Sequence, residues 1–389
     1  MKIAHVADFY LPRLGGIEVH LHDLAIRQRA AGHTVDVITS SPLGAPGAPG
    51  ELPPEHEASV LRIGAGLRWQ HPLNPVAAAR VYRVLKERDY DVVHAHAGVW
   101  SSLAFGGALA ASQLGIPSVL TWHSLLAWAH PLYRLVDWTI GWSTHDVLWT
   151  AVSAGAAKPL SSLLPGGTEV GVLPNAVDVE DWAVEPEERA DDEVHLVAVM
   201  RLAPRKRPHA LLKALTQVRR AVPDRVRIKV TVIGEGPERA TMERYVARHG
   251  LADVIEMPGR RTRAEICALY RRADVFIAPA KLESFGIAAL EARCAGVPVV
   301  AWRRTGIADF VQDGVHGLLV DSDAEMRDAL IRLCSEPGLR RELAAGSRAV
   351  PPPFSWSDAL VGAEDAYRRA AELVGKALPS HLPVPAAVG

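Results

Sequence analysis

Glu283 and Glu291 carry the clearest chemical signal in the sequence, because they stand eight positions apart in a segment that combines a loop, a helix and a strand. Gly286 is predicted to open the helix and Gly296 to end it. At 3.6 residues per turn, eight helical residues would place the two carboxylates on roughly one face, about 12 Å apart. That separation suits a long ligand with hydroxyl groups at both ends and phosphates between them, since free N–H groups at a helix start bind anions.

A simpler interpretation of the two glutamates stays open. Two acids on one helix often form only a solvated face. Against that reading, Glu291 lies within an apolar, alanine-rich stretch, where a carboxylate is costly to bury unless it has a partner.

Basic residues follow another predicted strand. Arg201 and Lys206 come after the strand predicted at 194–200 and before a helix predicted at 208–220. A guanidinium and an ammonium placed together can neutralise the charge that develops on a leaving diphosphate. A solvated basic loop is the alternative for this segment.

Two glycine turns could bring the backbone close to a ligand. Gly15 and Gly16 follow the first strand, predicted at 3–6, and begin a helix predicted at 16–31. They could admit a phosphate at the helix start, although a plain turn explains them equally. Gly234, in a Gly-x-Gly turn after the strand predicted at 226–233, is expected to let the backbone approach a ligand or the other domain.

Histidines are predicted at the carboxyl ends of two strands. His94 and His96 end one strand, and His123 follows the next. Their spacing gives no tight metal-ligand pattern, and no convincing Asp-x-Asp pair appears, so no metal site is predicted. His123 is predicted to hydrogen-bond a substrate, with packing at a domain interface as the alternative.

The elements that position these residues alternate between strand and helix in both halves of the chain. Such alternation predicts an α/β fold with a parallel sheet in each half. We expect an N-terminal domain at 1–173, an acidic, proline-broken linker at 174–192 and a second domain at 193–350. A proline-rich break then leads into a final helix at about 354–374, and 375–389 are expected to be a disordered tail.

The composition limits the class of protein. The chain has 389 residues, of which 49% are hydrophobic, enough for two full cores. Its 43 basic and 44 acidic residues argue against a nucleic-acid binder. Its three cysteines fall in predicted helices, where buried free thiols are expected. The absence of a leader-like or membrane-spanning segment predicts a cytoplasmic protein.

The order and spacing of these motifs resemble the retaining glycosyltransferases of family 4, over nearly all of residues 1–374. The motifs are the Gly15-Gly16 loop, Asp91-Val-Val-His-Ala-His96, Thr121-Trp-His-Ser124, Pro174-Asn-Ala-Val-Asp178, Arg201 to Lys206, Gly234-Glu-Gly-Pro237 and Glu283-x7-Glu291. The resemblance implies a GT-B type fold, in which two Rossmann-like parallel-sheet domains face each other across a cleft, with the final helix packing back on the first domain. The first domain would serve the acceptor and the second the donor.

The resemblance also implies roles for single residues. Arg201 and Lys206 would grip the diphosphate, and Gly16 would face the same phosphates. Glu291 would bind ribose hydroxyls, and Glu283 the donor sugar, which His123 would touch near the reacting carbon. The backbone N–H groups of Ser284, Phe285, Gly286 and Ile287 would meet the donor, and the base would lie near Met257 and Arg260.

The expected reaction is transfer of a hexose from a nucleoside diphosphate sugar, UDP- or GDP-linked, to an acceptor hydroxyl with retention and without metal or cofactor. The acceptor could be a small molecule, a glycan or a lipid-linked sugar. A sugar-nucleotide epimerase and a non-catalytic sugar-nucleotide binder are the alternatives. Thr305-Gly-Ile-Ala-Asp309 departs from the family's usual Gly-Gly-x-x-Glu. The tryptophans between Trp122 and Trp149 could pack in the core, bind acceptor or contact the inner membrane face.

Overall fold

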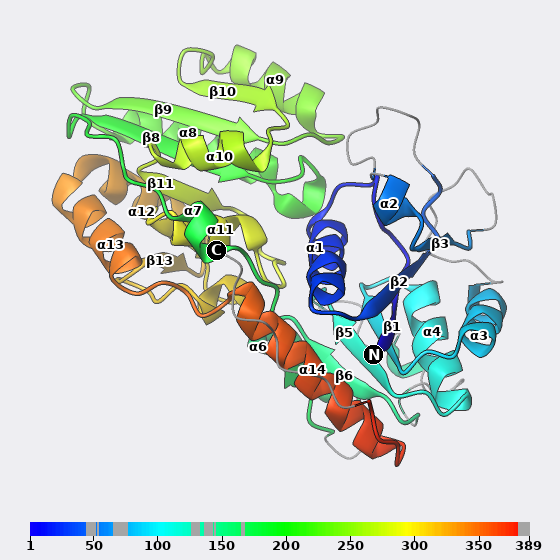
Figure 1. Ribbon diagram of the computed structural model, residues 1–389. Helices are drawn as coiled ribbons and strands as arrows, with labels where there is room; N and C mark the ends of the chain where they lie inside the picture. Colours follow the sequence, from blue (N-terminus) through cyan, green and yellow to red (C-terminus); the bar gives the residue numbers. More distant parts are fainter. Residues whose placement is uncertain are drawn as a thin grey trace. The chain divides into compact units, whose positions relative to one another are not determined.

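The computed structural model describes residues 1–43, 52, 54–64, 77–125, 133–135, 143, 145–164 and 168–379. The chain divides into two compact units, the first Met1–Ala176 with Trp356–Gly389 and the second Val177–Ser355. Each unit is built on its own parallel sheet (Figure 1).

Within the described residues, the first unit holds a seven-stranded parallel sheet in the order β3-β2-β1-β4-β5-β6-β7. The strand order reverses between β1 and β4, which is where open α/β sheets bind ligands, at the carboxyl ends of the strands. The strands are β1 Lys2–Ala7, β2 Thr34–Thr39, β3 Val60–Arg62, β4 Val92–Ala97, β5 Ser118–Trp122, β6 Leu148–Ala151 and β7 Gly171–Val172.

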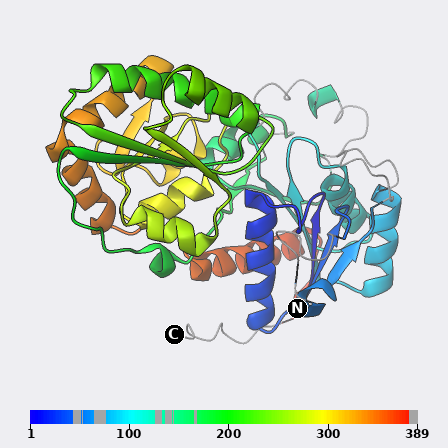
Figure 2. The ribbon, with the colours of Figure 1, turned by 90° about the horizontal axis from the view of Figure 1, so that it is seen from above.

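Helices cover both faces of the first sheet, because successive side chains of a buried strand point to opposite faces. Ile3 shares a core cluster with residues of α1 and α14, whereas Ala4 shares one with residues of α3 and α4. Both views show α1 and α3 on opposite sides of these strands (Figures 1 and 2). The helices are α1 Gly16–Ala30, α2 Pro54–Glu57, α3 Ala77–Arg88, α4 Ser102–Gln113, α6 Ala154–Ser161 and α14 Trp356–Leu373.

The second unit repeats the plan with a six-stranded parallel sheet, counted over the described residues, in the order β10-β9-β8-β11-β12-β13. Here the strand order reverses between β8 and β11. The strands are β8 Glu193–Val199, β9 Arg227–Ile233, β10 Ile255–Gly259, β11 Val275–Ala278, β12 Val299–Trp302 and β13 Gly317–Val320.

One face of the second sheet packs against α8, α9 and α12 through a shared apolar cluster. On the other face, Tyr270 of α10 meets Phe276 of β11 edge to face, with ring centroids 6.2 Å apart. The helices are α7 Val179–Trp182, α8 Pro208–Ala221, α9 Arg239–Arg248, α10 Arg263–Tyr270, α11 Ile287–Cys294, α12 Asp323–Ser335 and α13 Pro337–Ala349, with short 3-10 helices η4 Pro204–Lys206 and η5 Gly306–Asp309.

Local sequence explains where these helices begin. Thr262 and Glu265 form a reciprocal capping box at the start of α10. The Ser322 side chain accepts from the backbone N–H of Glu325 at the start of α12. Pro208 opens α8, where its missing N–H costs no helical hydrogen bond.

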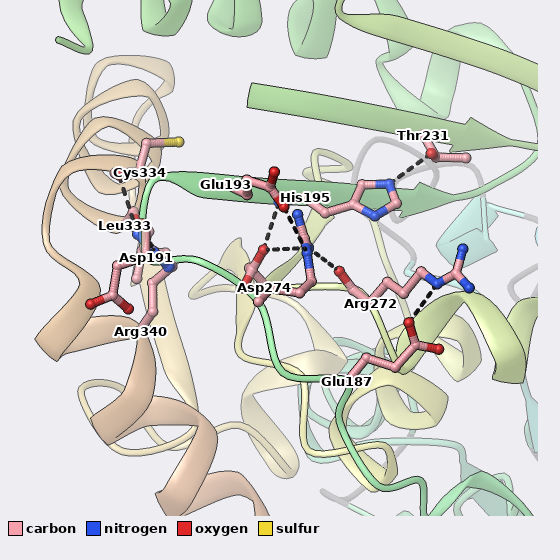
Figure 3. A network of polar contacts seen from close by, with 11 residues as sticks. Glu187, Asp191, Glu193, His195, Thr231, Arg272, Asp274, Leu333, Cys334 and Arg340 are labelled. Carbon is pink, nitrogen blue, oxygen red and sulfur yellow. Dashed lines mark hydrogen bonds and ion pairs between the residues drawn. The ribbon is translucent and has the colours of Figure 1, made fainter. Parts of the chain in front are cut away.

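Charged residues close the second sheet at the amino ends of β8 and β11 (Figure 3). The Asp274 carboxylate accepts from the backbone N–H of His195 at 2.7 Å and from Arg189 at 3.0 Å. Arg340 of α13 donates to the carbonyls of Leu333 and Asp191 at 2.8 and 2.7 Å. These bonds attach the segment before β8 to the amino end of the sheet. The carboxyl ends of the strands lie at the opposite edge.

The structure confirms the predicted α/β architecture. Val275–Ala278 and Gly317–Val320 are strands with the predicted bounds. Gly286 stands at the entry to α11 as predicted, since the helix begins at Ile287 and Glu283 lies in the preceding loop. The residues from Glu283 to Glu291 are therefore not all helical. His94 and His96 were predicted at a strand end, whereas β4 runs through both of them.

Residues 177–192, predicted as linker, fall within the second unit. They include α7, whose Trp182 packs against Tyr270 with ring centroids 5.9 Å apart. Glu187 pairs with Arg272 at 2.8 Å. These contacts order a segment whose sequence shows no periodicity.

The cysteines and the chain's last residues agree only in part with the predictions. Cys267, Cys294 and Cys334 lie in helices and are free, but only Cys334 is fully buried. In the predicted tail 375–389, Leu378 packs partly against the first core, and residues 380–389 lie outside the described residues. Among the described residues, no helix has both the length and the hydropathy needed to cross a bilayer.

Candidate active site

The loops after β8 and β11 meet where the strand order of the second sheet reverses. Lys206, at the end of η4, forms an ion pair with Glu283 of the loop before α11. Both side chains are about one-fifth exposed, at 20% and 17%, so that an incoming ligand could reach them. The sequence predicted both residues, and the structure brings them into direct contact.

Arg201 lies on the same edge, two residues beyond β8. Its side chain is exposed, and among the described residues no hydrogen bond or ion pair holds it. A guanidinium in this condition is available to an anion. Its neighbour Arg207 is already engaged, since it forms a bidentate pair with Asp323 at 2.8 and 2.7 Å.

The Gly234–Gly236 turn packs against the loop that carries Arg201. A Cβ at Gly234 would lie 1.9 Å from the carbonyl oxygen of Met200, and one at Gly236 would lie 2.2 Å from that of Leu202. Leu202 donates its N–H to the Glu235 carbonyl at 2.9 Å. The close backbone approach expected for Gly234 is therefore made to this loop, within the same unit. The turn supports the backbone of the loop at Arg201.

Gly286 makes the sharp turn into α11, with a φ of +92° that favours glycine. No side chain caps the helix, so its first N–H groups are open to a ligand. Ser284, Gly286 and Ile287 are half-buried, whereas Phe285 is 2% exposed and its ring packs against Phe310. Only the backbone of Phe285 can therefore serve a ligand.

The remaining donor-side residues predicted from the sequence occupy two elements. Glu291 lies in the second turn of α11 and is 9% exposed. Its charge raises the pKa of the Tyr270 hydroxyl, an effect second to burial. Met257 is half-buried in β10, and Arg260 is exposed just after that strand.

The chain contains two Asp-x-Asp sequences, Asp89-Tyr-Asp91 and Asp321-Ser-Asp323, and three of these acids have other partners. Asp91 accepts the backbone N–H of Lys2 at 2.6 Å, at the amino end of the first sheet. Asp321 pairs with Arg303 at 3.1 Å, and Asp323 with Arg207. These contacts give the acids structural roles.

In the first unit, Gly15 precedes α1 in extended conformation, and Gly16 is its first residue. Glu18 folds back over this turn, so that a Cβ at Gly15 would lie 2.3 Å from its carboxylate oxygen. Glu18 also pairs with Arg13 at 3.3 Å. An anion at this helix start would have to displace the carboxylate of Glu18.

His123 is buried just after β5, and its Nε2 lies 3.0 Å from Nδ1 of His96. Nε2 of His96 lies 2.9 Å from Nδ1 of His5 on β1. Burial lowers the pKa of His123 to about 3 and that of His5 to about 4, so both rings are neutral at physiological pH.

His5 was not predicted, because a single histidine in an apolar strand belongs to no motif. The alternation of side chains along β1 could have indicated that His5 is buried in the sheet. In the structure His5 lies opposite His94 on the neighbouring strand. His5, His94 and His96 could each offer a nitrogen within 4.8 Å of the others, a grouping that the spacing of the histidines had not indicated.

Trp122 and Trp149 lie in the apolar core of the first unit. This agrees with the prediction that these tryptophans pack in the core. Trp128, Trp138 and Trp142 lie outside the described residues.

Comparison with known proteins places this chain in a family. Residues 14–181 match the family described as Glycosyltransferase Family 4, and residues 180–350 match Glycosyl transferases group 1. The D-inositol 3-phosphate glycosyltransferase of Actinosynnema mirum is 30% identical over 402 residues, covering 92% of this chain and 93% of the relative. The chain belongs to the GT-B glycosyltransferases.

This glycosyltransferase is also similar to other known proteins. The glycogen synthase of Mycobacterium tuberculosis is 27% identical over 398 residues, covering 94% of each chain. Among solved structures, Anabaena HepE in complex with UDP and glucose has a TM-score of 0.74 at 20% identity, covering 95% of this chain and 100% of HepE. WaaG, a glycosyltransferase involved in lipopolysaccharide biosynthesis, has a TM-score of 0.69 at 18% identity, covering 96% and 100%. At these identities the structures establish a shared fold.

Proposed function

We propose that this glycosyltransferase moves a hexose from a nucleoside diphosphate sugar to an acceptor hydroxyl, with retention at the anomeric carbon. The observation that supports it best is the contact between Lys206 and Glu283 at the reversal point of the second sheet. A cation for the diphosphate and an acid for sugar hydroxyls stand there side by side. Arg201, exposed on the same edge, supplies a second cation.

In the proposed reaction, the bond between the anomeric carbon and the diphosphate oxygen breaks while the acceptor oxygen attacks from the same face. Arg201 and Lys206 stabilise the negative charge that develops on the departing diphosphate, an effect worth about 3–4 kcal/mol per key donor. The departing phosphate takes the acceptor proton. Glu283 is held by Lys206, which favours a role in binding sugar hydroxyls over one as covalent nucleophile.

We further propose that the reaction needs no metal ion. The two cationic side chains, Arg201 and Lys206, supply the charge that a divalent ion would otherwise provide. Asp321 and Asp323, the acids of the nearest Asp-x-Asp pair, are neutralised by Arg303 and Arg207. Activity retained in excess EDTA would agree with this proposal, and activity restored only by a divalent ion would contradict it.

The donor is proposed to be a UDP-sugar, with a GDP-sugar as the alternative. HepE, which shares the fold, was solved with UDP and with UDP-glucose. In this chain Glu291 would take the ribose hydroxyls, the start of α11 would meet the phosphates, and Met257 and Arg260 would border the base. A thermal-shift panel can test the donor, since a ligand at 100 times its Kd stabilises a protein by about 2.7 kcal/mol.

The decisive experiment is turnover followed by analysis of the product. The protein is incubated with UDP-, GDP- and ADP-sugars and with acceptors that include D-inositol 3-phosphate and a glucan, the compounds suggested by the names of the relatives. Release of the diphosphate with an α-linked product from an α-linked donor is expected. A β-linked product would overturn retention, and free sugar without acceptor transfer would favour the epimerase.

A further inference from the structure

A row of buried polar side chains crosses one face of the first sheet. His5 lies opposite His94, His96 lies opposite Thr121, and Thr121 lies opposite Thr150. These residues share the face that α1 and α14 cover, because they alternate with the residues that face α4. Buried polar groups must be paired, so the partners of each can be followed atom by atom.

The row begins at a backbone carbonyl, which can only accept. The Thr150 hydroxyl donates to the Leu120 carbonyl at 3.3 Å. Thr150 Oγ1 must then accept from the Thr121 hydroxyl, 2.7 Å away. Thr121 Oγ1 in turn accepts from Nε2 of His94 at 2.7 Å. His94 is neutral, since burial lowers its pKa well below the ordinary value, and its Nδ1 is therefore an acceptor.

The row continues through the last helix and the first. The Tyr367 hydroxyl of α14 donates to Nδ1 of His94 at 3.0 Å and accepts from the Gln28 amide nitrogen at 2.9 Å. This orientation of Gln28 on α1 turns its oxygen toward Nε2 of His5, 2.6 Å away. Because that oxygen can only accept, His5 carries its proton on Nε2, and its Nδ1 is an acceptor.

The last two links end at His123. His96 donates from Nε2 to Nδ1 of His5 at 2.9 Å, which leaves Nδ1 of His96 as an acceptor. His123 then donates from Nε2 to that atom at 3.0 Å. Every bond in the row thus points the same way, from His123 toward the Leu120 carbonyl. The opposite direction would require Gln28 to invert its amide and Thr150 to give up that carbonyl.

The same rings could be taken for a metal site, since His5, His94 and His96 offer nitrogens close together. However, both ring nitrogens of His94 are used in hydrogen bonds to Tyr367 and Thr121. Both nitrogens of His5 and both of His96 are used in the same way. A hydrogen-bonded row therefore accounts for all six nitrogens without a metal ion.

We propose that His96, oriented by His5 and Gln28, is a positioning residue that fixes His123 in the tautomer with its proton on Nε2. Nδ1 of His123 is then an acceptor. The expected effect on turnover rests on the proposed function, whereas the tautomer itself does not.

The tautomers can be measured without substrate, by long-range 15N–1H correlation spectra of the protein labelled with 15N-histidine at pH 7.5. The expected result is Nε2–H for His5, His94, His96 and His123, assigned through single substitutions. His123 or His96 protonated on Nδ1 would overturn the proposal. Shifts of these signals on addition of one equivalent of Zn²⁺ would also overturn it, because they would identify a metal site. A protein that failed to transfer sugar would leave these spectra unchanged, so the two failures are distinguishable.

Two pairs of variants test the directional effect. Thr150→Val removes the hydroxyl that donates to the Leu120 carbonyl at the far end of the row. In this variant His123 is expected to show a mixture of tautomers. The kcat/KM of the variant for the donor sugar should fall at least threefold. Thr216→Val, which removes a buried hydroxyl from α8 of the second unit, is the matched control and should leave both unchanged. His96→Leu should lose the single tautomer and lower kcat/KM about 10-fold, while His96→Asn, whose amide oxygen can accept, should restore much of both. An unaltered His123 tautomer in folded Thr150→Val would overturn the claim that the Leu120 carbonyl sets the direction of the row.

Discussion

Lys206 and Glu283 neutralise each other across the reversal point of the second sheet. The pair joins the loop after β8 to the loop before α11, and both ends remain partly open to solvent. A nucleoside diphosphate bound as proposed would therefore compete with Glu283 for the ammonium of Lys206. Glu283 would raise the cost of holding the diphosphate alone and favour the complete donor, whose sugar hydroxyls give the carboxylate new partners.

Glu283→Gln should bind UDP more tightly than the unaltered protein while turning over donor more slowly. A partly exposed ion pair is worth about 0.5–1 kcal/mol, so its loss predicts a roughly 2- to 5-fold lower Kd for UDP. Turnover should fall by at least ~10-fold, because the sugar hydroxyls lose the carboxylate that is proposed to bind them. Isothermal titration with UDP and initial-rate kinetics measure the two effects. Weaker binding of UDP by this variant would show that Glu283 helps to hold the diphosphate.

Lys206→Ala should lower turnover at least ~100-fold while the protein stays folded, since a lost donor to a developing anion typically costs that much. Lys213→Ala is a suitable control, because Lys213 is an exposed lysine of the neighbouring α8. Steady-state rates and thermal melting of both variants provide the comparison. Near-normal turnover in Lys206→Ala would remove this residue from the mechanism.

Gly286→Ala should weaken donor binding through the shape of the loop. Besides the strain of a positive φ, the new Cβ would lie 2.6 Å from Cγ1 of Ile307 and 3.3 Å from Cγ of Glu283. Gly314→Ala is matched in strain, with φ of +75°, but its Cβ meets no atom within 4 Å. Urea denaturation should show a loss of about 1 kcal/mol for Gly314→Ala and a larger one for Gly286→Ala. Only Gly286→Ala should also raise the Kd for UDP; equal behaviour of the two variants would rule out a specific role for this contact.

Acid should destabilise the first unit through its buried histidines. The folded-state pKa is about 4 for His5 and about 3 for His123, below the ordinary value of 6.5. The unfolded chain therefore binds protons that the folded chain does not, so stability present above pH 6.5 is lost as the pH falls toward 4. The loss approaches about 1.4 kcal/mol per pH unit for each histidine. Denaturant midpoints that stayed constant from pH 7 to pH 5 would contradict this expectation.

Asp8 has the opposite effect to the histidines on how stability depends on pH. Burial raises its pKa to about 6, although the backbone N–H groups of Leu103 and Ala104 donate to it at 2.9 and 3.1 Å. Its contribution is therefore greatest at low pH and is lost as the pH rises through 6. Asp8→Asn should remove that opposing contribution and make the acid loss steeper between pH 6 and pH 4. The slope of unfolding free energy against pH, compared between the two proteins, measures it; parallel slopes would argue against the raised pKa.

The fold was predictable where strong apolar runs are bounded by glycine or proline, as in β11 and β13. The short edge strands β3 and β7 were missed, because strands of three and two residues carry almost no periodicity. The charged helix α13 was missed because its buried face holds only a few residues, Leu343 among them.

For the candidate site, the sequence indicated Lys206 and Glu283 separately. Their contact depends on the adjacency of β8 and β11, which strand order alone determines. The polar row that leads to His123 was harder to foresee. Gln28 and Tyr367 stand 339 positions apart, and neither belongs to a motif.

The hydroxyl of Tyr367 belongs to the final helix of the chain, yet it completes the polar row inside the first unit. During synthesis on the ribosome, residues 1–176 emerge long before this helix. Until it docks, Nδ1 of His94 and the amide nitrogen of Gln28 lack the partner that Tyr367 supplies. The amino-terminal half can therefore acquire its finished interior only after translation is nearly over, and a nascent chain stalled before residue 356 would hold an incomplete one.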